Sequence, residues 1–356
     1  MTIVLLLLYA LIIILGMCRN KSRAVFVLEF LFAWLLIAGN FDNADYEQYL
    51  IRYQRDLGVL TDPGFSLLCN LFNGLGWDYQ SFKALLSFVC LLLVFSTIHK
   101  MSRYPALGGA IFLIFPFIID ITQFRNFVSY SIVIGGLPYL FKPGKRNLLK
   151  YSLIVLVAGL FHTASLFYLS FVLTRYRLKV WHVAAMTAGV FVVKEAVKLF
   201  FSATFETNKL EAVETSSMMG AIFGSVVLIM GIVLIWYAYR QMRPFLMKHR
   251  RLVPYLRRTR APWLRFCTQR TWLYCNILFL MIIPFLFDNG NYIRICRNMA
   301  LMNMLFVSNA FYIKKKMRTA ILVVYYAYFV GTTYLIGNNL GDVFMPAFQY
   351  NNLLLG

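Results

Sequence analysis

The polar residues best suited to chemistry in this chain stand between long apolar runs. Arg125 lies in the sequence Gln123-Phe124-Arg125-Asn126. The planar guanidinium of an arginine binds two phosphate oxygens at once, and the flanking amides suit contacts with a polar substrate. An arginine between two apolar spans is costly unless it is paired. The pattern indicates an anion site and an ordinary interfacial anchor equally well.

A second basic group follows late in the chain. Arg294 and Arg297 are spaced i, i+3, so they share a face if the stretch is helical, and Asn298 comes next. Combined with Arg125, these two arginines would form a strong pyrophosphate site. Positive charge at the outer end of a span is unusual but permitted, so simple anchoring remains the alternative interpretation.

One histidine stands inside an apolar run, in Phe161-His162-Thr163-Ala164-Ser165. Such a histidine is either a hydrogen-bonded core residue or a group that exchanges protons near neutral pH. The residue types alone favour the core interpretation, so a role for His162 in proton transfer needs further support.

Acids and aromatic residues lie close together in a third group. Asp45 begins the motif Asp45-Tyr46-x-x-Tyr49, and Asp62 precedes Pro63-Gly64-Phe65. Aromatic rings stack on the C–H groups of sugars, while carboxylates accept protons from sugar hydroxyls. An interfacial tyrosine belt explains Tyr49 about as well, and Asp45 less well.

The elements that must position these residues are membrane-spanning helices. Of the 356 residues, 60% are hydrophobic and 14% are charged, whereas soluble domains carry about 25% charged residues. The deficit fits a lipid-facing surface, because a charge at the bilayer centre costs several kcal/mol. The net charge of +21 comes from short loops between apolar runs. That pattern sets topology and argues against nucleic acid as a partner.

The apolar runs predict an all-α fold, a polytopic integral membrane helical bundle with about ten to twelve transmembrane helices. We expect 1–356 to form a single membrane domain whose first span stays in the membrane with its N-terminus outside. The predicted spans are 2–17, 24–40, 80–98, 105–120, 127–141, 148–161, 163–174, 180–199, 217–239, 271–287, 295–313 and 319–336.

Charge sets the predicted orientation of these spans. Most of the 35 Lys and Arg fall in loops on one side, and every Asp and Glu except Glu29 falls on the other. By the positive-inside rule the basic side is cytoplasmic. Within 148–174, two short spans keep both flanking basic clusters inside, so a hairpin that raises His162 toward the outer face is favoured over one tilted span.

Two loops differ from the rest. The outer loop 41–79 is the longest, and its stretch 65–76 is too short to span and too apolar for a free loop. It predicts a re-entrant or interfacial helix. The predicted cytoplasmic loop 240–270 is the most basic. Topology and headgroup contacts explain its charge better than a dedicated site for anionic lipid or a cytoplasmic partner. Shorter outer segments are predicted at 120–126, 200–216 and 288–298.

Patterns of metal ligands or cofactor binding are missing from the sequence. The six cysteines form no CxxC pair, and the chain contains no DxD and no clustered set of His and Cys. Cysteines in apolar runs behave as small core residues. We therefore expect metal-independent chemistry without a cofactor.

The motifs, taken in order, resemble those of the EpsG-like branch of Wzy polysaccharide polymerases, and the similarity covers most of the chain. One departure is visible, because the family often has Glu before Pro-Gly-Phe and this chain has Asp62. The acid is kept but its reach is shorter. The motifs that carry the resemblance are Asp45-Tyr46-x-x-Tyr49, Asp62-Pro63-Gly64-Phe65, Gln123-x-Arg125-Asn126, Phe161-His162-Thr163-Ala164-Ser165, the pair Arg294/Arg297 and Met345-Pro346-Ala347-Phe348-x-Tyr350.

The resemblance implies an enzyme of the bacterial inner membrane with its active site facing the periplasm or exterior. Such an enzyme transfers a growing glycan from undecaprenyl pyrophosphate to the non-reducing end of a lipid-linked repeat unit, often beside a chain-length co-polymerase. In that interpretation the arginines bind the pyrophosphate, while Tyr46, Tyr49, Gln123 and Asn126 bind substrate. The general base would be His162, Asp45 or Asp62, in that order.

Other functions stay open from the sequence. A glycosyltransferase that adds one sugar from a lipid phosphate would use the same outer residues and give a single product. A transporter or flippase would tend to show internal repeats and ionisable residues near mid-membrane. An acyltransferase would leave the arginines without a role.

Overall fold

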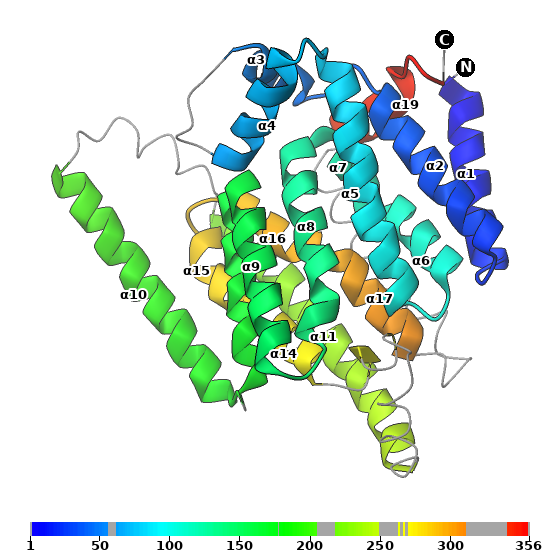
Figure 1. Cartoon of the computed structure of the whole chain (residues 1–356). Coiled ribbons are helices and arrows are strands. Elements are labelled where there is room, and N and C mark those ends of the chain that lie inside the picture. Colours follow the sequence, from blue (N-terminus) through cyan, green and yellow to red (C-terminus); the bar gives the residue numbers. More distant parts are fainter. Residues whose placement is uncertain are drawn as a thin grey trace.

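The computed structural model shows an all-α protein (Figure 1). It describes residues 2–55, 62–176, 178–204, 218–248, 263, 266–267, 270–310 and 340–354. Extended pairing within these residues is limited to one isolated antiparallel bridge, between Asn40 and Asn351. The helices of the sequence-predicted bundle are therefore present, and the fold class is confirmed.

The first half of the chain builds a compact group of helices. Its apolar runs become helices because the only way to satisfy backbone groups in lipid is within the segment itself. Ser22 and Asp78 cap α2 and α5 through their side-chain oxygens, and Pro105 starts α6. These helices are α1 (Thr2–Cys18), α2 (Arg23–Gly39), α5 (Tyr79–Met101), α6 (Pro105–Phe112), η1 (Leu113–Phe117), α7 (Ile118–Thr122) and α8 (Phe124–Leu140).

The hairpin predicted at 148–174 is confirmed. The α-helix α9 (Lys145–Phe161) ends at His162, whose backbone is extended, and the 3-10 helix η2 (Thr163–Arg175) runs back. The hydroxyl of Tyr151 donates to the carbonyl of Tyr168 at 2.9 Å, which places the two limbs side by side. Ser129 of α8 hydrogen-bonds both the Ala158 carbonyl and Ser165, at 2.7 and 2.6 Å. Buried bonds of this kind fix the hairpin against α8.

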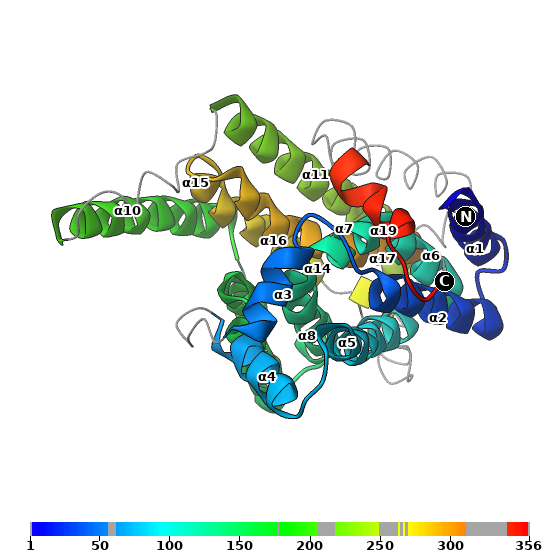
Figure 2. The same cartoon turned by 90° about the horizontal axis from the view of Figure 1, so that it is seen from above.

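The second half of the chain adds further helices around α8 and η2. In both views α10 stands apart from α1 and α2, at the opposite side of the molecule (Figures 1 and 2). The elements are α10 (Val180–Thr204), α11 (Met218–Lys248), α14 (Thr271–Leu278), η5 (Phe279–Ile282), α15 (Ile283–Leu286), η6 (Gly290–Tyr292), α16 (Ile293–Asn298), α17 (Ala300–Ala310), η9 (Leu340–Phe344) and α19 (Pro346–Gln349).

The long outer segment holds two helices, α3 (Tyr46–Gln54) and α4 (Pro63–Gly74). The short apolar helix predicted at 65–76 is therefore present as α4. Phe65 and Cys69 are buried, while Leu67 and Leu71 are exposed. A helix with one face on the protein and an apolar face outward is typical of the membrane interface, and its re-entrant or interfacial placement stays a prediction.

The helices fit a protein that crosses the membrane. Three are long and apolar enough by length and composition, Tyr79–Met101, Pro105–Thr122 and Met218–Gln241, and two shorter apolar ones are Thr2–Cys18 and Thr271–Leu286. Every predicted span coincides with a helix where the structure describes it. The span 319–336 and most of the loops 200–216 and 240–270 lie outside the described residues, so the total of ten to twelve stays a prediction.

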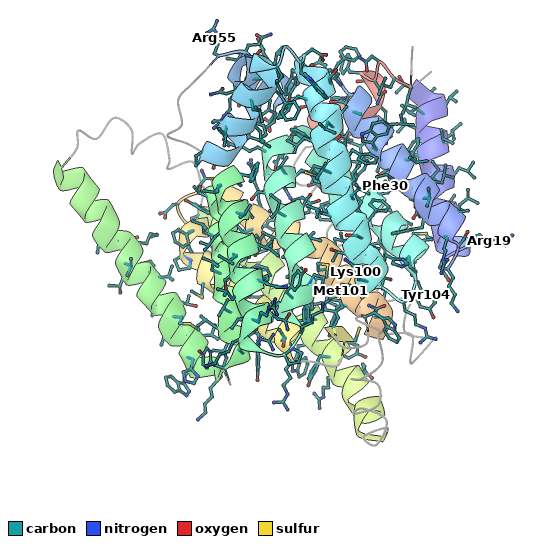
Figure 3. All side chains as sticks on the ribbon, in the orientation of Figure 1. Arg19, Phe30, Arg55, Lys100, Met101 and Tyr104 are labelled. Atoms are coloured by element: carbon teal, nitrogen blue, oxygen red, sulfur yellow. The ribbon has the colours of Figure 1, made fainter. Side chains whose placement is uncertain are left out.

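The two ends of the bundle carry different elements, and the predicted separation of charge between them stays a prediction. Figure 3 places Arg55 at the end that carries α3 and α4, and Arg19 and Lys100 at the far ends of α1 and α5. The polar residues singled out in the sequence belong to the first of these ends.

Candidate active site

A polar pocket of about 570 Å³ opens at the end of the bundle that carries α3. Seen from above, α3 lies across the ends of α8 and α16 (Figure 2). One wall of the pocket is α3. The opposite wall combines the start of α8, the tip of the α9–η2 hairpin and α16. The lining residues are Asp45, Gln48, Tyr49, Ile51, Arg52, Gln123, Arg125, Asn126, His162 and Arg294.

The α3 wall is one stripe of a short helix. Asp45, Gln48, Tyr49 and Arg52 follow the spacing i, i+3, i+4, i+7, which puts all four side chains on one face. An Asp at a helix N-cap usually binds the backbone of its own helix. Here Asp45 makes no side-chain cap bond and lines the pocket, while its backbone amide donates to the Asn43 side chain at 3.1 Å. The Asp45 carboxylate is therefore directed at the pocket.

Asp62 is the central contact of the opposite wall. Its Oδ2 lies 2.7 Å from Nη1 of Arg125, and its Oδ1 accepts from the Thr163 amide at 3.2 Å. Nδ1 of His162 is buried and lies 3.9 Å from the same Oδ1, which is beyond hydrogen-bond range. One carboxylate thus ties the start of α8 to the hairpin tip and faces the buried nitrogen of His162.

The Asp62-Pro63-Gly64-Phe65 motif explains how Asp62 reaches this position. Asp62 has φ 55° and ψ 65°, a left-handed conformation that non-glycine residues rarely adopt and that functional sites often hold. Pro63 then starts α4. A Cβ on Gly64 would lie 3.0 Å from Leu160 Cβ, so glycine permits α4 to approach the end of α9. The buried ring of Phe65 supports Arg52, whose guanidinium lies 5.8 Å from the ring centroid.

Charges alternate across the pocket. The Asp45 carboxylate interacts with Arg294 and Arg125, and Asp62 interacts with Arg125 and Arg52. The order is therefore Arg294, Asp45, Arg125, Asp62 and Arg52. Because three arginines outnumber two carboxylates, the pocket presents positive charge to an entering anion.

The two carboxylates differ in their acidity. Burial raises the pKa of Asp45 above the ordinary value, against the pull of Arg294 and Arg125. Burial also acts to raise the pKa of Asp62, but the facing His162 and the Arg125 charge outweigh it, so the pKa of Asp62 falls below its ordinary value. Burial and the nearby Asp45 charge raise the pKa of Tyr49 to about 12, so its hydroxyl stays protonated.

Amide contacts hold α16 against α8. Asn126 and Asn298 exchange two hydrogen bonds through their side chains, at 3.0 and 2.9 Å. Arg297 donates to the side-chain oxygen of Gln123, and the Tyr168 hydroxyl donates to the Ile295 carbonyl at 2.7 Å. These contacts set the position from which Arg294 lines the pocket.

The structure brings the sequence-predicted residues together but divides them into two groups. Seven line the pocket: Asp45, Tyr49, Gln123, Arg125, Asn126, His162 and Arg294. Three lie behind it, namely Asp62, Tyr46 and Arg297. The hydroxyl of Tyr46 donates to Gln80 at 3.1 Å, away from the pocket. Arg294 and Arg297 were expected to share one face of a helix. In the short helix α16, only Arg294 lines the pocket, whereas Arg297 is directed to Gln123.

Three lining residues were not predicted as site residues, Gln48, Ile51 and Arg52. The spacing from Asp45 was the signal that could have found Gln48 and Arg52. Arg52 also donates to the Ser66 hydroxyl of α4 at 3.0 Å. Within the part of the chain that the structure describes, no cluster of three or more His, Cys, Asp or Glu is arranged to hold a metal ion.

The fold and the pocket define an all-α membrane protein with an arginine-rich polar site at one end of its helices. The sequence of the chain also matches a known family. The model of the EpsG family matches residues 23–352, and the chain belongs to that family. It is therefore a membrane protein of the polysaccharide-polymerase-like class. No curated protein and no solved structure matches the chain.

Proposed function

We propose that the protein is a polysaccharide repeat-unit polymerase of the bacterial inner membrane, with its pocket facing the periplasm or exterior. It transfers a growing glycan from undecaprenyl pyrophosphate to the non-reducing end of a lipid-linked repeat unit. The observation that carries this proposal is the meeting of three arginines, one carboxylate and one histidine at a single pocket, with Asp62 paired to Arg125 directly behind it. Family membership supports the coarser class.

The arginines suit the leaving group. When the bond between the anomeric carbon and the pyrophosphate oxygen breaks, that oxygen takes the electron pair and negative charge develops on it. Arg125 and Arg294 then stabilise this charge, with Arg52 beside them. The first amides of α8 add to the attraction, because a helix N-terminus carries partial positive charge. A preorganised cationic site of this kind needs no metal ion for the departure of the pyrophosphate.

A base must take the proton of the attacking hydroxyl. His162 is the first candidate, since it lines the pocket and its buried Nδ1 faces Asp62. A neutral imidazole that keeps its proton on Nδ1 offers Nε2 as the acceptor. Asp62 then acts as the residue that orients the ring, because its lowered pKa makes it a weak base. Asp45 is the second candidate, since a raised pKa strengthens a carboxylate as a base.

The test is a reconstitution. Purified protein in lipid is incubated with lipid-linked repeat units from its own organism, with and without EDTA, and the products are separated on a gel. The proposal predicts a ladder of repeats in both samples. In one displacement the new bond has the inverted anomeric configuration, which NMR of the product checks.

Variants of α3 give a matched control. Arg52→Ala removes a lining arginine and is expected to shorten or abolish the ladder, whereas Arg55→Ala removes an exposed arginine one turn later and leaves it intact. A product with a single added sugar would show that the protein is a one-step glycosyltransferase and not a polymerase. A folded protein that makes no product from matched substrate would reject both.

A further inference from the structure

The closing motif Met345-Pro346-Ala347-Phe348 has no role in the pocket, yet it is tightly held. Phe348 is fully buried, and its ring lies 5.0 Å from that of Tyr9 in α1. The short helix α19 contacts α1, α2 and α7 (Figure 1). Beyond it, the Asn351 side chain donates to the carbonyls of Leu35 and Leu36 at 3.2 Å each. The segment 345–352 therefore covers the end of α2.

Asn40 is the residue through which this segment connects to the rest of the outer end. It pairs with Asn351 in the isolated bridge, and its side-chain amide donates to the carbonyls of Pro346 and Tyr350 at 3.1 Å each. The Asn40 carbonyl in turn accepts from Lys83 at 2.6 Å and from Gln80 at 3.1 Å. Lys83 and Asn40 are almost fully buried, so these bonds form where unpaired polar groups would be costly.

Two routes lead from Asn40 to the α3 wall of the pocket. In the first, Asn43 donates to the Asn40 side chain at 2.6 Å and accepts from the Asp45 amide at 3.1 Å. In the second, Gln80 accepts from the Tyr46 hydroxyl at 3.1 Å. Asp45 begins the stripe that lines the pocket, and Tyr46 is the first residue of α3. Further along α3, Tyr53 is buried, packs on Phe82 of α5 and donates to the Trp77 carbonyl at 2.7 Å.

We propose that the C-terminal segment 345–352 is a positioning element of the pocket: through Asn351, Asn40, Asn43 and Gln80 it sets where α3 places Asp45, Tyr49 and Arg52. None of the four network residues touches the pocket, so they act through α3. The activity part of the test rests on the proposed polymerase function, and the exchange part does not.

The main test compares two adjacent asparagines in lipid nanodiscs. Asn351→Ala removes a buried side chain of the network, whereas Asn352→Ala makes the same change at an exposed neighbour. Hydrogen exchange of the α3 amides is expected to quicken about tenfold in Asn351→Ala, as the loss of one or two hydrogen bonds implies. Exchange in the α9–η2 hairpin stays as in the parent, and Asn352→Ala changes neither. Unaltered α3 exchange in folded Asn351→Ala overturns the proposal.

Tyr46→Phe provides a milder variant if Asn351→Ala does not fold. It removes only the hydroxyl that joins α3 to Gln80 and keeps the ring on Tyr79. The α3 amides are expected to exchange several-fold faster. Identical exchange in Tyr46→Phe and the parent overturns the second route of the network.

Activity then separates positioning from general damage. With α3 displaced, KM for the acceptor rises about tenfold while kcat changes less than twofold. A merely structural loss lowers the amount of active protein, and so kcat, at unchanged KM, which contradicts the proposal. If the parent itself makes no polymer, the proposed function fails, and the exchange result still decides the role of the segment.

Discussion

The two walls of the pocket are built differently. The wall formed by α8, the hairpin tip and α16 belongs to the helical bundle, where Asn126, Asn298 and Ser129 form buried side-chain bonds. The α3 wall lies on the outer segment, where Asn43 and Gln80 hydrogen-bond the first residues of α3 and the ring of Tyr53 packs on Phe82 of α5. One wall thus lies within the helical bundle, whereas the other is a short outer helix attached through its first residues and through Tyr53.

The carboxylates of the two walls show what this difference does. Asp62 is enclosed by its partners and has a lowered pKa, whereas Asp45 is desolvated and has a raised one. An enclosed, ionised acid suits the positioning of Arg125 and His162. A desolvated acid that lines the pocket suits contact with a hydroxyl. The same residue type therefore serves two tasks because its surroundings differ.

The largest effect is expected from Arg125→Ala. Removal of a donor to a developing anion typically costs about 10² to 10³ in rate, so polymer should fall at least that far on a gel with single-turnover timing. The variant also removes the ion-pair partner 2.7 Å from Asp62, whose side chain is only 6% exposed, and such a loss costs roughly 3 kcal/mol of stability. The double variant Arg125→Ala/Asp62→Asn should regain stability and not activity. Full-length polymer from Arg125→Ala would falsify the leaving-group role.

Arg294→Ala should separate chemistry from stability on the same wall. Polymer formation is expected to fall about 10²-fold, because a second donor to the pyrophosphate is lost. Thermal unfolding should stay within a degree or two of the parent, since Asn298 and Arg297 still hold α16. A large drop in the unfolding temperature would show that Arg294 supports the fold of this wall as well as lining the pocket.

Asp45→Asn tests the α3 wall, with about a tenfold loss of activity expected. Its effect on stability has the opposite sign to that of Arg125→Ala. Because the folded pKa of Asp45 is raised, ionisation favours the unfolded state, and this penalty grows as pH rises through the folded pKa. At neutral pH the variant should therefore unfold at the parent temperature or slightly above it. A clear loss of stability of Asp45→Asn at neutral pH would contradict a raised pKa of Asp45.

The smallest expected effect is the loss, at acid pH, of the stability that the Asp62 carboxylate contributes. Its folded pKa is lowered, so its contribution to stability is fully present above the ordinary value of about 3.9 and is lost as pH falls through the folded pKa. The unfolding temperatures of the parent and of Asp62→Asn, measured between pH 7 and pH 3, should become equal only at the acid end. Convergence already near pH 5 would mean that the pKa of Asp62 is not lowered.

Some features of the protein followed from its sequence alone. Apolar runs and basic loops are local properties, so they predicted the helices and the turn at His162. The ordered motifs also named most residues that line the pocket, because each motif lies at the end of a helix at the same side of the bundle. The spacing within α3 contained the signal for Arg52 as well.

Other features depended on contacts between distant segments. Which arginine faces the pocket was decided by α16, since Arg297 donates to Gln123 and Arg294 lines the pocket. The division between Asp45 and Asp62 was decided by burial and by partners more than fifty residues away. The link from Asn351 to Asn40 spans almost the whole chain. Local sequence fixes what a helix exposes, but only the tertiary structure determines which neighbours desolvate, pair with and orient each charged group.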